Sequence, residues 1–285
     1  MGKVRIVTDS TADIPLEVRE KLGISMVPLK VLFGEETYLD GVTIQNEEFY
    51  AKLVASPVLP TTSQPSPSEF SEMYERLLAE DPEGPIISLH LSAALSGTYQ
   101  SAVIAQSMLE EAGDITIVDS KSASYGFGMR AIRAAEMAQA GESKEAILAE
   151  LQRLESEMQI YFLVDSLEYL QKGGRIGKAS ALIGSILNIK PILSLEPDGT
   201  VYPVDKVRGT KKAMARVLEL LKQRFDAQEP VSMTIAWSSG QETAMELCEY
   251  LKSHFNIQKI GFTTIGAVIG THTGPGLSAV FMYKV

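Results

Sequence analysis

Ser96 occupies a position where a side chain could attack a substrate or bind one. It lies in the segment LSAALSGTYQSA, between an apolar run that predicts a strand and a pattern that predicts a helix over residues 98–111. A serine on such a turn can be a nucleophile. It can also cap the helix by accepting hydrogen bonds from the free N–H groups of the first turn. Residues 91–102 alone do not separate these roles.

A nucleophilic Ser96 needs a general base and an acid that orients the base. His272, with Asp9 or Asp119, could complete such a triad, and the protein would then be a serine hydrolase or acyltransferase. The G-x-S-x-G pattern of the α/β-hydrolases is absent around Ser96, however. Anion binding explains this segment better, because Gly97 lets a ligand approach the backbone and the helix dipole favours a negative charge.

Two other segments present polar side chains beside glycine or proline. Thr62 lies in TTSQPSPSEF, just before a helix whose start is marked by Ser66, Pro67 and Glu69. His272 lies in IGTHTGPGLSA, where the glycines and the proline predict a tight loop between two strands. That loop is either a simple turn or a polar tip that closes over a ligand.

The sequence gives little indication of a nucleotide-binding site or a metal site. The segment GGRIGKAS lacks both the first glycine and the final hydroxyl residue of a P-loop, and no G-x-G-x-x-G follows a strand. The histidines at positions 90, 254 and 272 are too scattered for a metal site. We therefore expect no metal and no cofactor.

The charge balance and the cysteine content limit further which class of protein this chain can belong to. The chain carries 36 acidic and 26 basic residues, a net charge of −10, which argues against a nucleic-acid partner. A single cysteine, Cys248, rules out an internal disulfide framework and indicates the cytoplasm. No apolar run approaches the roughly 18 residues of a membrane span.

One segment, residues 172–212, is basic in this acidic chain. It is either an ordinary solvated face or a docking surface for a partner that handles phosphate, since arginine grips phosphate oxygens with two hydrogen bonds. Its basic residues are Lys172, Arg175, Lys178, Lys190, Lys206, Arg208, Lys211 and Lys212.

The alternation of apolar patterns predicts an α/β fold of two domains. In residues 1–156, strands alternate with helices, which predicts a three-layer domain with a mainly parallel sheet. In residues 157–285, a hairpin at Asp198 and Gly199 is mixed with helices, which predicts an α/β domain with a mixed sheet. Ligands of parallel sheets bind beyond the carboxyl ends of the strands, where Ser10, Ser96 and Ser120 are expected to project.

Taken together, the motifs resemble the DegV family of fatty-acid-binding proteins. The segments that carry the resemblance span the chain in order: VTDSTADIP, TTSQPSPSEF, LSAALSGTYQSA, VDSKSAS, SLEYLQKGGRIG, RGTKKA and GTHTGPG. The resemblance implies two α/β domains with a long-chain fatty acid between them. It also implies a partner, an ATP-dependent kinase subunit that phosphorylates the bound acid to an acyl phosphate, and it allows transient contact with a membrane.

The resemblance also assigns roles to individual residues. Thr62, Ser96 and Gly97 are expected at the fatty-acid carboxylate, with Thr271 and His272 nearby. Arg175 and Arg208 are expected on the surface that meets the kinase, although Gly209 stands where the family often has a hydroxyl residue. With no arginine inside the site, the carboxylate oxygens would stay accessible to the kinase.

A buried fatty-acid tail needs an apolar tunnel, and each buried CH₂ contributes about 0.8 kcal/mol. The segment ALIGSILNIKPIL is the best candidate for its lining, although ordinary core packing explains any one of its residues equally well. The lining residues expected there are Leu182, Ile183, Ile186, Leu187 and Ile189.

Three classes of function follow from these observations. The leading hypothesis is a non-catalytic fatty-acid carrier that serves a kinase. The second is the serine hydrolase or acyltransferase built on Ser96 and His272, and the third is a sensor whose fatty-acid occupancy controls a protein partner. A DNA-binding regulator is disfavoured by the net charge and by the lack of a recognition helix.

Overall fold

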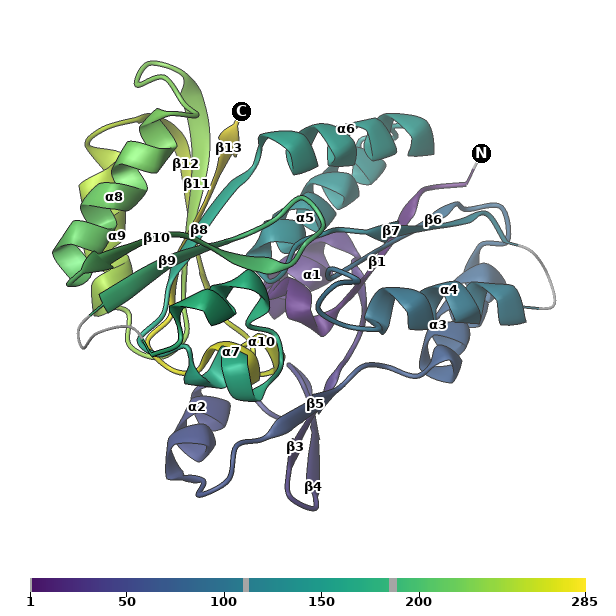
Figure 1. Cartoon of the computed structure of the whole chain (residues 1–285). Helices are drawn as coiled ribbons and strands as arrows, with labels where there is room; N and C mark the ends of the chain where they lie inside the picture. The colour runs from purple at the N-terminus through teal and green to yellow at the C-terminus, as the bar shows by residue number, and fades with distance from the viewer. Residues whose placement is uncertain (1, 110–112, 185–188) are drawn as a thin grey trace.

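The computed structural model describes residues 2–109, 113–184 and 189–285. It contains two larger sheets, with helices packed around them, and a smaller sheet that projects below (Figure 1). This arrangement confirms the predicted α/β fold class with a parallel sheet and a mixed sheet.

The first sheet is parallel and has four strands in the order β2-β1-β6-β7. Both faces are covered, because neighbouring strand residues such as Ile6 and Val7 belong to different buried clusters. Helices α1 and α5 pack over one face and α3 and α4 over the other, while α6 packs on α5. The elements are β1 (Arg5–Asp9), η1 (Ser10–Ala12), α1 (Leu16–Leu22), β2 (Ser25–Val27), α3 (Pro67–Glu80), β6 (Ile86–His90), α4 (Thr98–Met108), β7 (Ile115–Asp119), α5 (Tyr125–Gln139) and α6 (Lys144–Glu157).

Two local sequence signals determine helix ends, and the one at α3 confirms a prediction. Gly23 ends α1 with a φ of 67°, a conformation that glycine adopts without strain. Ser66 and Glu69 form the predicted capping box at the start of α3, where Pro67 is the first helical residue.

A smaller antiparallel sheet was not predicted. It has the order β4-β3-β5 and comprises β3 (Lys30–Phe33), β4 (Glu36–Leu39) and β5 (Thr61–Ser63), with α2 (Asn46–Ala55) between its last two strands. The sequence predicted one strand region over residues 24–34, but the chain divides between two sheets at Pro28, which has no N–H to donate. Thr62, expected in a loop, lies in β5.

The second large sheet is mixed and has six strands in the order β10-β9-β8-β13-β11-β12. Only β11 and β12 run parallel, and the predicted hairpin joins β9 to β10. Helices α8 and α9 bury one face of the sheet. The elements are β8 (Gln159–Leu163), β9 (Ile189–Leu195), β10 (Val201–Arg208), α8 (Thr210–Lys222), β11 (Pro230–Trp237), α9 (Glu242–Lys252), β12 (Asn256–Thr264) and β13 (Ser278–Lys284).

Short helices lie beside the other face of this sheet: α7 (Glu168–Lys172), η2 (Gly177–Leu182) and α10 (Ala267–Thr273). The prediction of a loop around His272 is wrong, because His272 lies in the last turn of α10 and only residues 274–277 form the turn. A helix of seven residues is too short to produce a periodic apolar pattern, and α10 is held by tertiary contacts.

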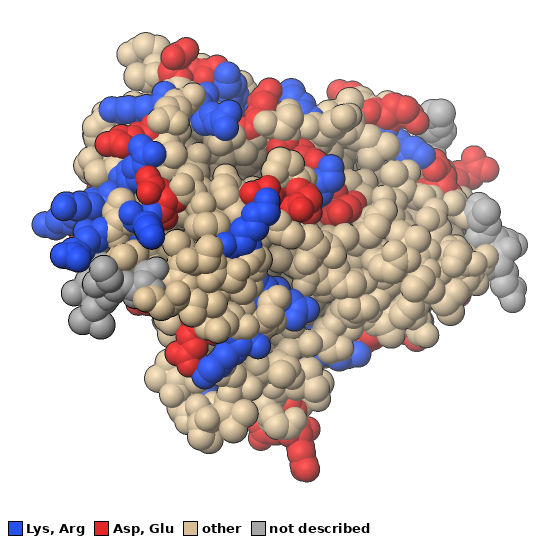
Figure 2. Space-filling model, viewed as in Figure 1, with Lys and Arg blue, Asp and Glu red and all other residues tan. Residues whose placement is uncertain are grey.

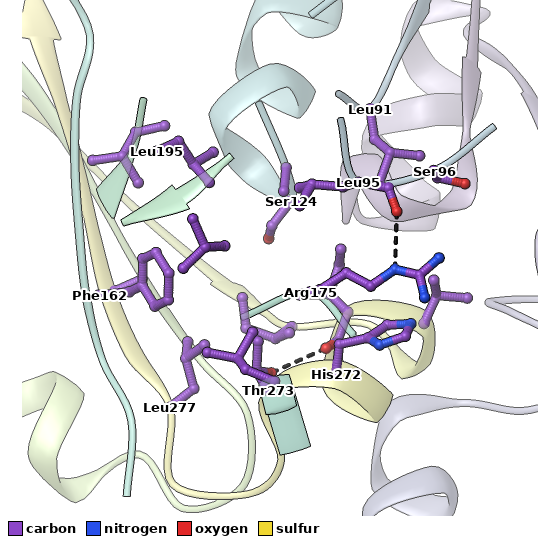
Figure 3. A pocket seen from close by; sticks show the side chains of 18 of the residues that line it. Leu91, Leu95, Ser96, Ser124, Phe162, Arg175, Leu195, His272, Thr273 and Leu277 are labelled. Carbon is purple, nitrogen blue, oxygen red and sulfur yellow. Dashed lines mark hydrogen bonds between the residues drawn. The ribbon is translucent and has the colours of Figure 1, made fainter. Parts of the chain in front are cut away.

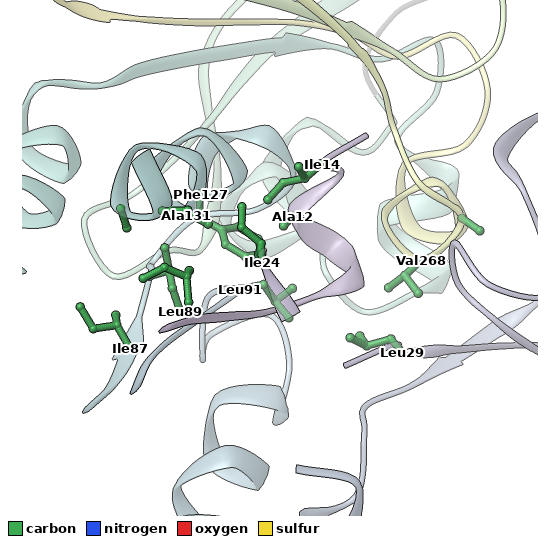
Figure 4. Close-up of a cluster of buried hydrophobic side chains, with 14 of the residues drawn as sticks. Ala12, Ile14, Ile24, Leu29, Ile87, Leu89, Leu91, Phe127, Ala131 and Val268 are labelled. Carbon is green, nitrogen blue, oxygen red and sulfur yellow. The ribbon is translucent and has the colours of Figure 1, made fainter. Parts of the chain in front are cut away.

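Helix α10 belongs to the C-terminal half of the chain but packs into the core of the N-terminal half. Ala267 and Val268 share a buried cluster with Leu29, Phe49 and Leu91 (Figure 4). The strands of the parallel sheet precede residue 156, and those of the mixed sheet follow residue 157. The exact domain boundary stays a prediction.

Candidate functional site

A largely apolar cavity lies between the parallel sheet and the mixed sheet (Figure 3). Its walls come from β8, β13, α10, the hairpin of β9 and β10, and the loops that follow β6 and β7. The apolar residues that line it are Leu29, Leu91, Leu95, Ala123, Ile160, Phe162, Leu170, Leu195, Val201, Ile265, Val268, Ile269, Leu277, Ala279 and Phe281. Such a surface suits a hydrocarbon chain.

Polar side chains gather at one end of the cavity. Ser96, Arg175 and His272 lie together there, opposite Phe162 and Leu195 (Figure 3). Thr62 joins them, because its Oγ1 lies 2.8 Å from Nε2 of His272 in a hydrogen bond. Strand β5, the start of α4 and the last turn of α10 therefore converge on one point, although they are far apart in the sequence.

His272 is neutral at physiological pH in this environment. Burial, and then the positive charge of Arg175, lower the pKa of its imidazole from 6.5 to about 4. Its Nδ1 is buried and has no hydrogen-bond partner among the described residues. Gly173 lies against this atom, since a Cβ at position 173 would be 2.3 Å from Nδ1. When the neutral ring carries its proton on Nε2, it donates to Oγ1 of Thr62 and leaves the hydroxyl hydrogen of Thr62 free for a ligand.

Ser96 precedes α4 and contacts its first residue. Its Oγ lies 2.9 Å from Oγ1 of Thr98 and accepts a hydrogen bond of 3.3 Å from the N–H of Thr98. Gly97 is the residue that directly precedes the helix. The hydroxyl of Ser96 thus caps the first turn and lines the cavity at the same time.

Gly97 is not among the residues that line the cavity, so its expected place at the carboxylate stays a prediction. A Cβ at this position would lie 2.3 Å from Oε1 of Gln64. The Gln64 amide fills that space and donates a 3.0 Å hydrogen bond to Oγ of Ser101. Gly97 therefore lets the segment after β5 dock on α4. Gln64 was missed by the sequence analysis, although it stands in the TTSQPS motif.

Thr271 lies beside the polar end of the cavity but not in its wall. Its hydroxyl is buried and donates a hydrogen bond of 2.9 Å to the carbonyl of Ala267 within α10. It lines a groove on the outer side of the site, with Tyr169 and Lys172, instead of the apolar cavity. The next hydroxyl residue, Thr273, lines the cavity and bonds to the carbonyl of Ile269 at 3.0 Å.

Arg175 lies at the polar end of the cavity, so the expectation of a site without an arginine is wrong. Its Nε donates to the carbonyl of Leu95 at 3.0 Å (Figure 3), and its Nη1 donates to the carbonyl of Gly173 at 2.7 Å. These bonds hold the guanidinium across the polar end while the residue stays exposed to solvent. Arg175 is thus both a surface residue and part of the cavity wall.

Arg208 lies elsewhere, at the end of the edge strand β10. It is exposed beside Lys206, Lys211 and Lys212, where basic side chains gather on the left of Figure 2. Lys172, Lys178 and Lys190 of the basic segment are instead paired with Glu168, Glu196 and Asp165. Residues 206–212 are therefore its more strongly basic part.

Of the expected tunnel residues, Leu182, Ile183 and Ile189 do not line this cavity. Leu182 ends η2, Ile183 is 46% exposed, and Ile189 pairs with Arg208 at the edge of the sheet. Ile186 and Leu187 lie outside the described residues. The cavity wall comes instead from strand residues such as Phe162 and Phe281. Both strands are apolar on both faces, so their sequence does not reveal which residues face a cavity.

The triad drawn for the hydrolase hypothesis does not form. Asp9 pairs with His90 at 3.0 Å, and Asp119 accepts hydrogen bonds from the N–H groups of Ala93 and Lys121. His272 bonds to Thr62, as described above. A second set of triad-like contacts, Ser88–His90–Asp9, is completely buried and closed to any substrate.

None of the helices in residues 2–109, 113–184 and 189–285 is long and apolar enough to cross a membrane. Within the same residues, no group of three or more histidine, cysteine, aspartate or glutamate side chains could hold a metal ion.

The fold and the site define an α/β protein whose sheets enclose an apolar cavity with hydroxyls, an imidazole and a guanidinium at one end. A model of the DegV family, described as uncharacterised proteins, matches residues 3–285. The chain belongs to the DegV family. Protein DegV of Bacillus subtilis is 38% identical to it over 274 residues, which are 96% of each chain.

Two solved structures that are similar to this chain are those of fatty-acid-binding proteins. The fatty-acid-binding DegV family protein of Thermus thermophilus is 38% identical, with a TM-score of 0.92, over 99% of this chain and 100% of its own. The stearic-acid-binding protein of Eubacterium ventriosum is 29% identical, with a TM-score of 0.88, over 100% of this chain and 98% of its own. Proteins of the same fold and similar length thus bind fatty acids.

Proposed function

We propose that this protein binds one long-chain fatty acid in the cavity, with its tail among the apolar side chains and its carboxylate at the polar end. The observation that carries the proposal is the gathering of Thr62, Ser96 and His272 at one end of an otherwise apolar cavity. About 0.8 kcal/mol for each buried CH₂ gives a long tail on the order of 10 kcal/mol. The polar groups then fix the direction in which the acid lies.

The polar end can hold a carboxylate without adding an acidic group of its own. The hydroxyls of Thr62 and Ser96 can each donate to an oxygen, and the neutral ring of His272 supports Thr62 by donating from Nε2 to its Oγ1. The guanidinium of Arg175 also lines this end of the cavity. A carboxylate held in this way is anionic and remains close to the protein surface.

The finer role is a carrier that presents the acid to a separate ATP-dependent kinase subunit. Support comes from Arg175, which is exposed to a partner and also lines the cavity, and from the outer groove that shares Thr62, Arg175 and His272 with the cavity. A partner docked over this groove would reach the carboxylate. In this proposal the protein is non-catalytic, needs no metal or cofactor and works in the cytoplasm.

The test is to extract the purified protein with organic solvent and analyse the extract by mass spectrometry. We expect a long-chain fatty acid in the extract, and rebinding of added fatty acid by the delipidated protein. Recovery of no fatty acid, together with no uptake of added oleate, would refute the proposal. Formation of acyl phosphate when the kinase subunit and ATP are added tests the carrier role separately.

A fluorophosphonate probe tests the non-catalytic assignment. We expect no labelling of Ser96, because its hydroxyl bonds to Thr98 and His272 bonds to Thr62. Labelling of Ser96 at any pH would contradict the non-catalytic assignment and support the hydrolase hypothesis.

A further inference from the structure

The position of His272 depends on the segment that enters α10, residues 263–267. This segment leaves the edge strand β12 of the mixed sheet and leads into the helix. It is held by hydrogen bonds from the N-terminal half of the chain. Asn46 donates to Oγ1 of Thr264 at 2.6 Å, and the hydroxyl of Tyr50 donates to the carbonyl of Ile265 at 3.1 Å.

Two carboxylates complete this attachment; Asp40 is buried and Asp13 is half-buried. Oδ1 of Asp13 accepts a 3.0 Å hydrogen bond from the N–H of Gly266, and Oδ1 of Asp40 accepts one of 3.1 Å from the N–H of Ala267. The backbone carbonyl of Asp13 also accepts a hydrogen bond of 2.9 Å from the hydroxyl of Thr263. The free N–H groups at the start of α10 are thus capped by residues more than two hundred positions away in the sequence.

Gly266 packs closely against both carboxylates, which also line a groove together with Arg19. A Cβ at Gly266 would lie 2.4 Å from Oδ1 of Asp13 and 3.5 Å from Oδ1 of Asp40. Asp13 itself adopts a φ of 51°, which is uncommon for a residue other than glycine, and Ser124 donates a hydrogen bond to its Oδ2. Ser124 has a positive φ too and lines the ligand cavity. Strain of this kind persists where the surroundings fix the conformation.

The cost of burying these carboxylates indicates that they have a role. Burial is the largest cause that raises the pKa of Asp13 well above 3.8 and the pKa of Asp40 to about 6. Oδ2 of Asp40 has no hydrogen-bond partner among the described residues, and the residue is 2% exposed. Removing a carboxylate from water costs stability unless its partners compensate, so packing alone does not explain Asp13 and Asp40.

We propose that Asp13 and Asp40 are positioning residues that fix the first turn of α10 and thereby hold His272 within hydrogen-bonding distance of Thr62. The inference rests on the proposed function, since Thr62 and His272 then form the carboxylate end of the cavity. Neither Asp13 nor Asp40 lines that cavity. The DSTADIP segment and the Asp40–Gly41 turn, which belong to the N-terminal half, therefore determine the geometry of a site that they do not touch.

The experiment compares two ligands of the same chain length, oleate and oleyl alcohol. The variants are Asp13→Ala, Asp40→Ala and the closer replacements Asp13→Asn and Asp40→Asn, whose amide oxygens can still accept from Gly266 and Ala267. Ile147→Ala, a fully buried position on α6, controls for general loss of stability.

For the alanine variants we expect oleate affinity to fall about tenfold, the effect of one misplaced hydrogen bond to a charged group, while oleyl alcohol affinity stays within about twofold. The asparagine variants recover part of the loss. In Ile147→Ala the ratio of the two affinities stays as in the unchanged protein. If both ligands weaken equally in the aspartate variants, or if neither does, the inference is wrong.

A second measurement does not depend on ligand binding. The pKa of His272, followed by NMR in the ligand-free protein, should rise from about 4 toward 6.5 in Asp40→Ala, and by less in Asp40→Asn, because the loosened helix exposes the ring. An unchanged pKa in folded Asp40→Ala would refute the positioning role. If the unchanged protein binds neither oleate nor oleyl alcohol, the proposed function fails, while this titration still decides the role of Asp13 and Asp40.

Discussion

Replacing His272 by glutamine should change how the stability of the protein depends on pH. Glutamine keeps a polar group that can bond to Thr62 but does not titrate. In the folded protein the pKa of His272 is lowered from 6.5 to about 4, so the unfolded chain binds the proton more readily between these two values. The stability that the neutral ring contributes is therefore present at pH 7 and is lost as the pH falls from 6.5 to 4.

The size of the effect follows from the pKa. A fall from 6.5 to about 4 corresponds to about 3 kcal/mol of unfolding free energy, of which about 2 kcal/mol is lost between pH 7 and pH 4.5. Asp40 acts in the opposite direction. Its pKa is raised to about 6, so its ionisation weakens the fold as the pH rises from 4 to 6. The two effects partly cancel in the unchanged protein. Only the difference in unfolding free energy between the unchanged protein and His272→Gln isolates the contribution of His272.

The assay is urea unfolding at pH 7 and pH 4.5, followed by the fluorescence of Trp237, which is the single tryptophan. When the pH is lowered from 7 to 4.5, the unchanged protein should lose about 2 kcal/mol more unfolding free energy than His272→Gln. His254→Gln, at a site outside the cavity, is the matched control. An equal change in the unchanged protein and in His272→Gln would refute the assignment of a desolvated, neutral imidazole.

Three further predictions concern the polar end of the cavity. Gly97→Ala should cost about 1 kcal/mol in urea unfolding, because its Cβ displaces the Gln64 amide from Ser101, and Gln64→Ala should remove most of that cost in the double variant. Additive losses would contradict this contact. Ser96→Ala should lower oleate affinity about tenfold in calorimetry while costing at most about 1 kcal/mol of stability; a larger loss of stability without ligand would make Ser96 chiefly a helix cap. Arg175→Gln should raise the pKa of His272 in an NMR titration and reduce acyl phosphate formation with the kinase subunit, whereas an unchanged pKa would show that the guanidinium does not act on the ring.

The local parts of the fold could be predicted because they depend on residues that are neighbours in the sequence. The capping box of α3, the glycine that ends α1 and the hairpin at Asp198 and Gly199 are of this kind. The small sheet β4-β3-β5 and helix α10 were missed, since both are short and are stabilised by distant residues. Contacts between distant residues leave no local pattern in the sequence.

The same distinction applies to the site. Thr62, Ser96 and His272 could be selected from their motifs, and the structure brings all three to the polar end of the cavity. The lining of the cavity could not be predicted, because strands such as β8 and β13 are buried on both faces. Their sequences do not indicate which face meets a void and which meets a packed helix.

The sequence by itself determined the α/β class, the acidic character and the polar residues that can bind a carboxylate, because these depend on composition and local pattern. Only the tertiary structure decided that Gly97 makes room for Gln64, that Arg175 lies at the polar end and that Asp13 and Asp40 hold the start of α10. Each of these facts joins residues that are distant in the chain. Side-chain packing and burial set such contacts, and they exist only once both sheets and α10 have come together.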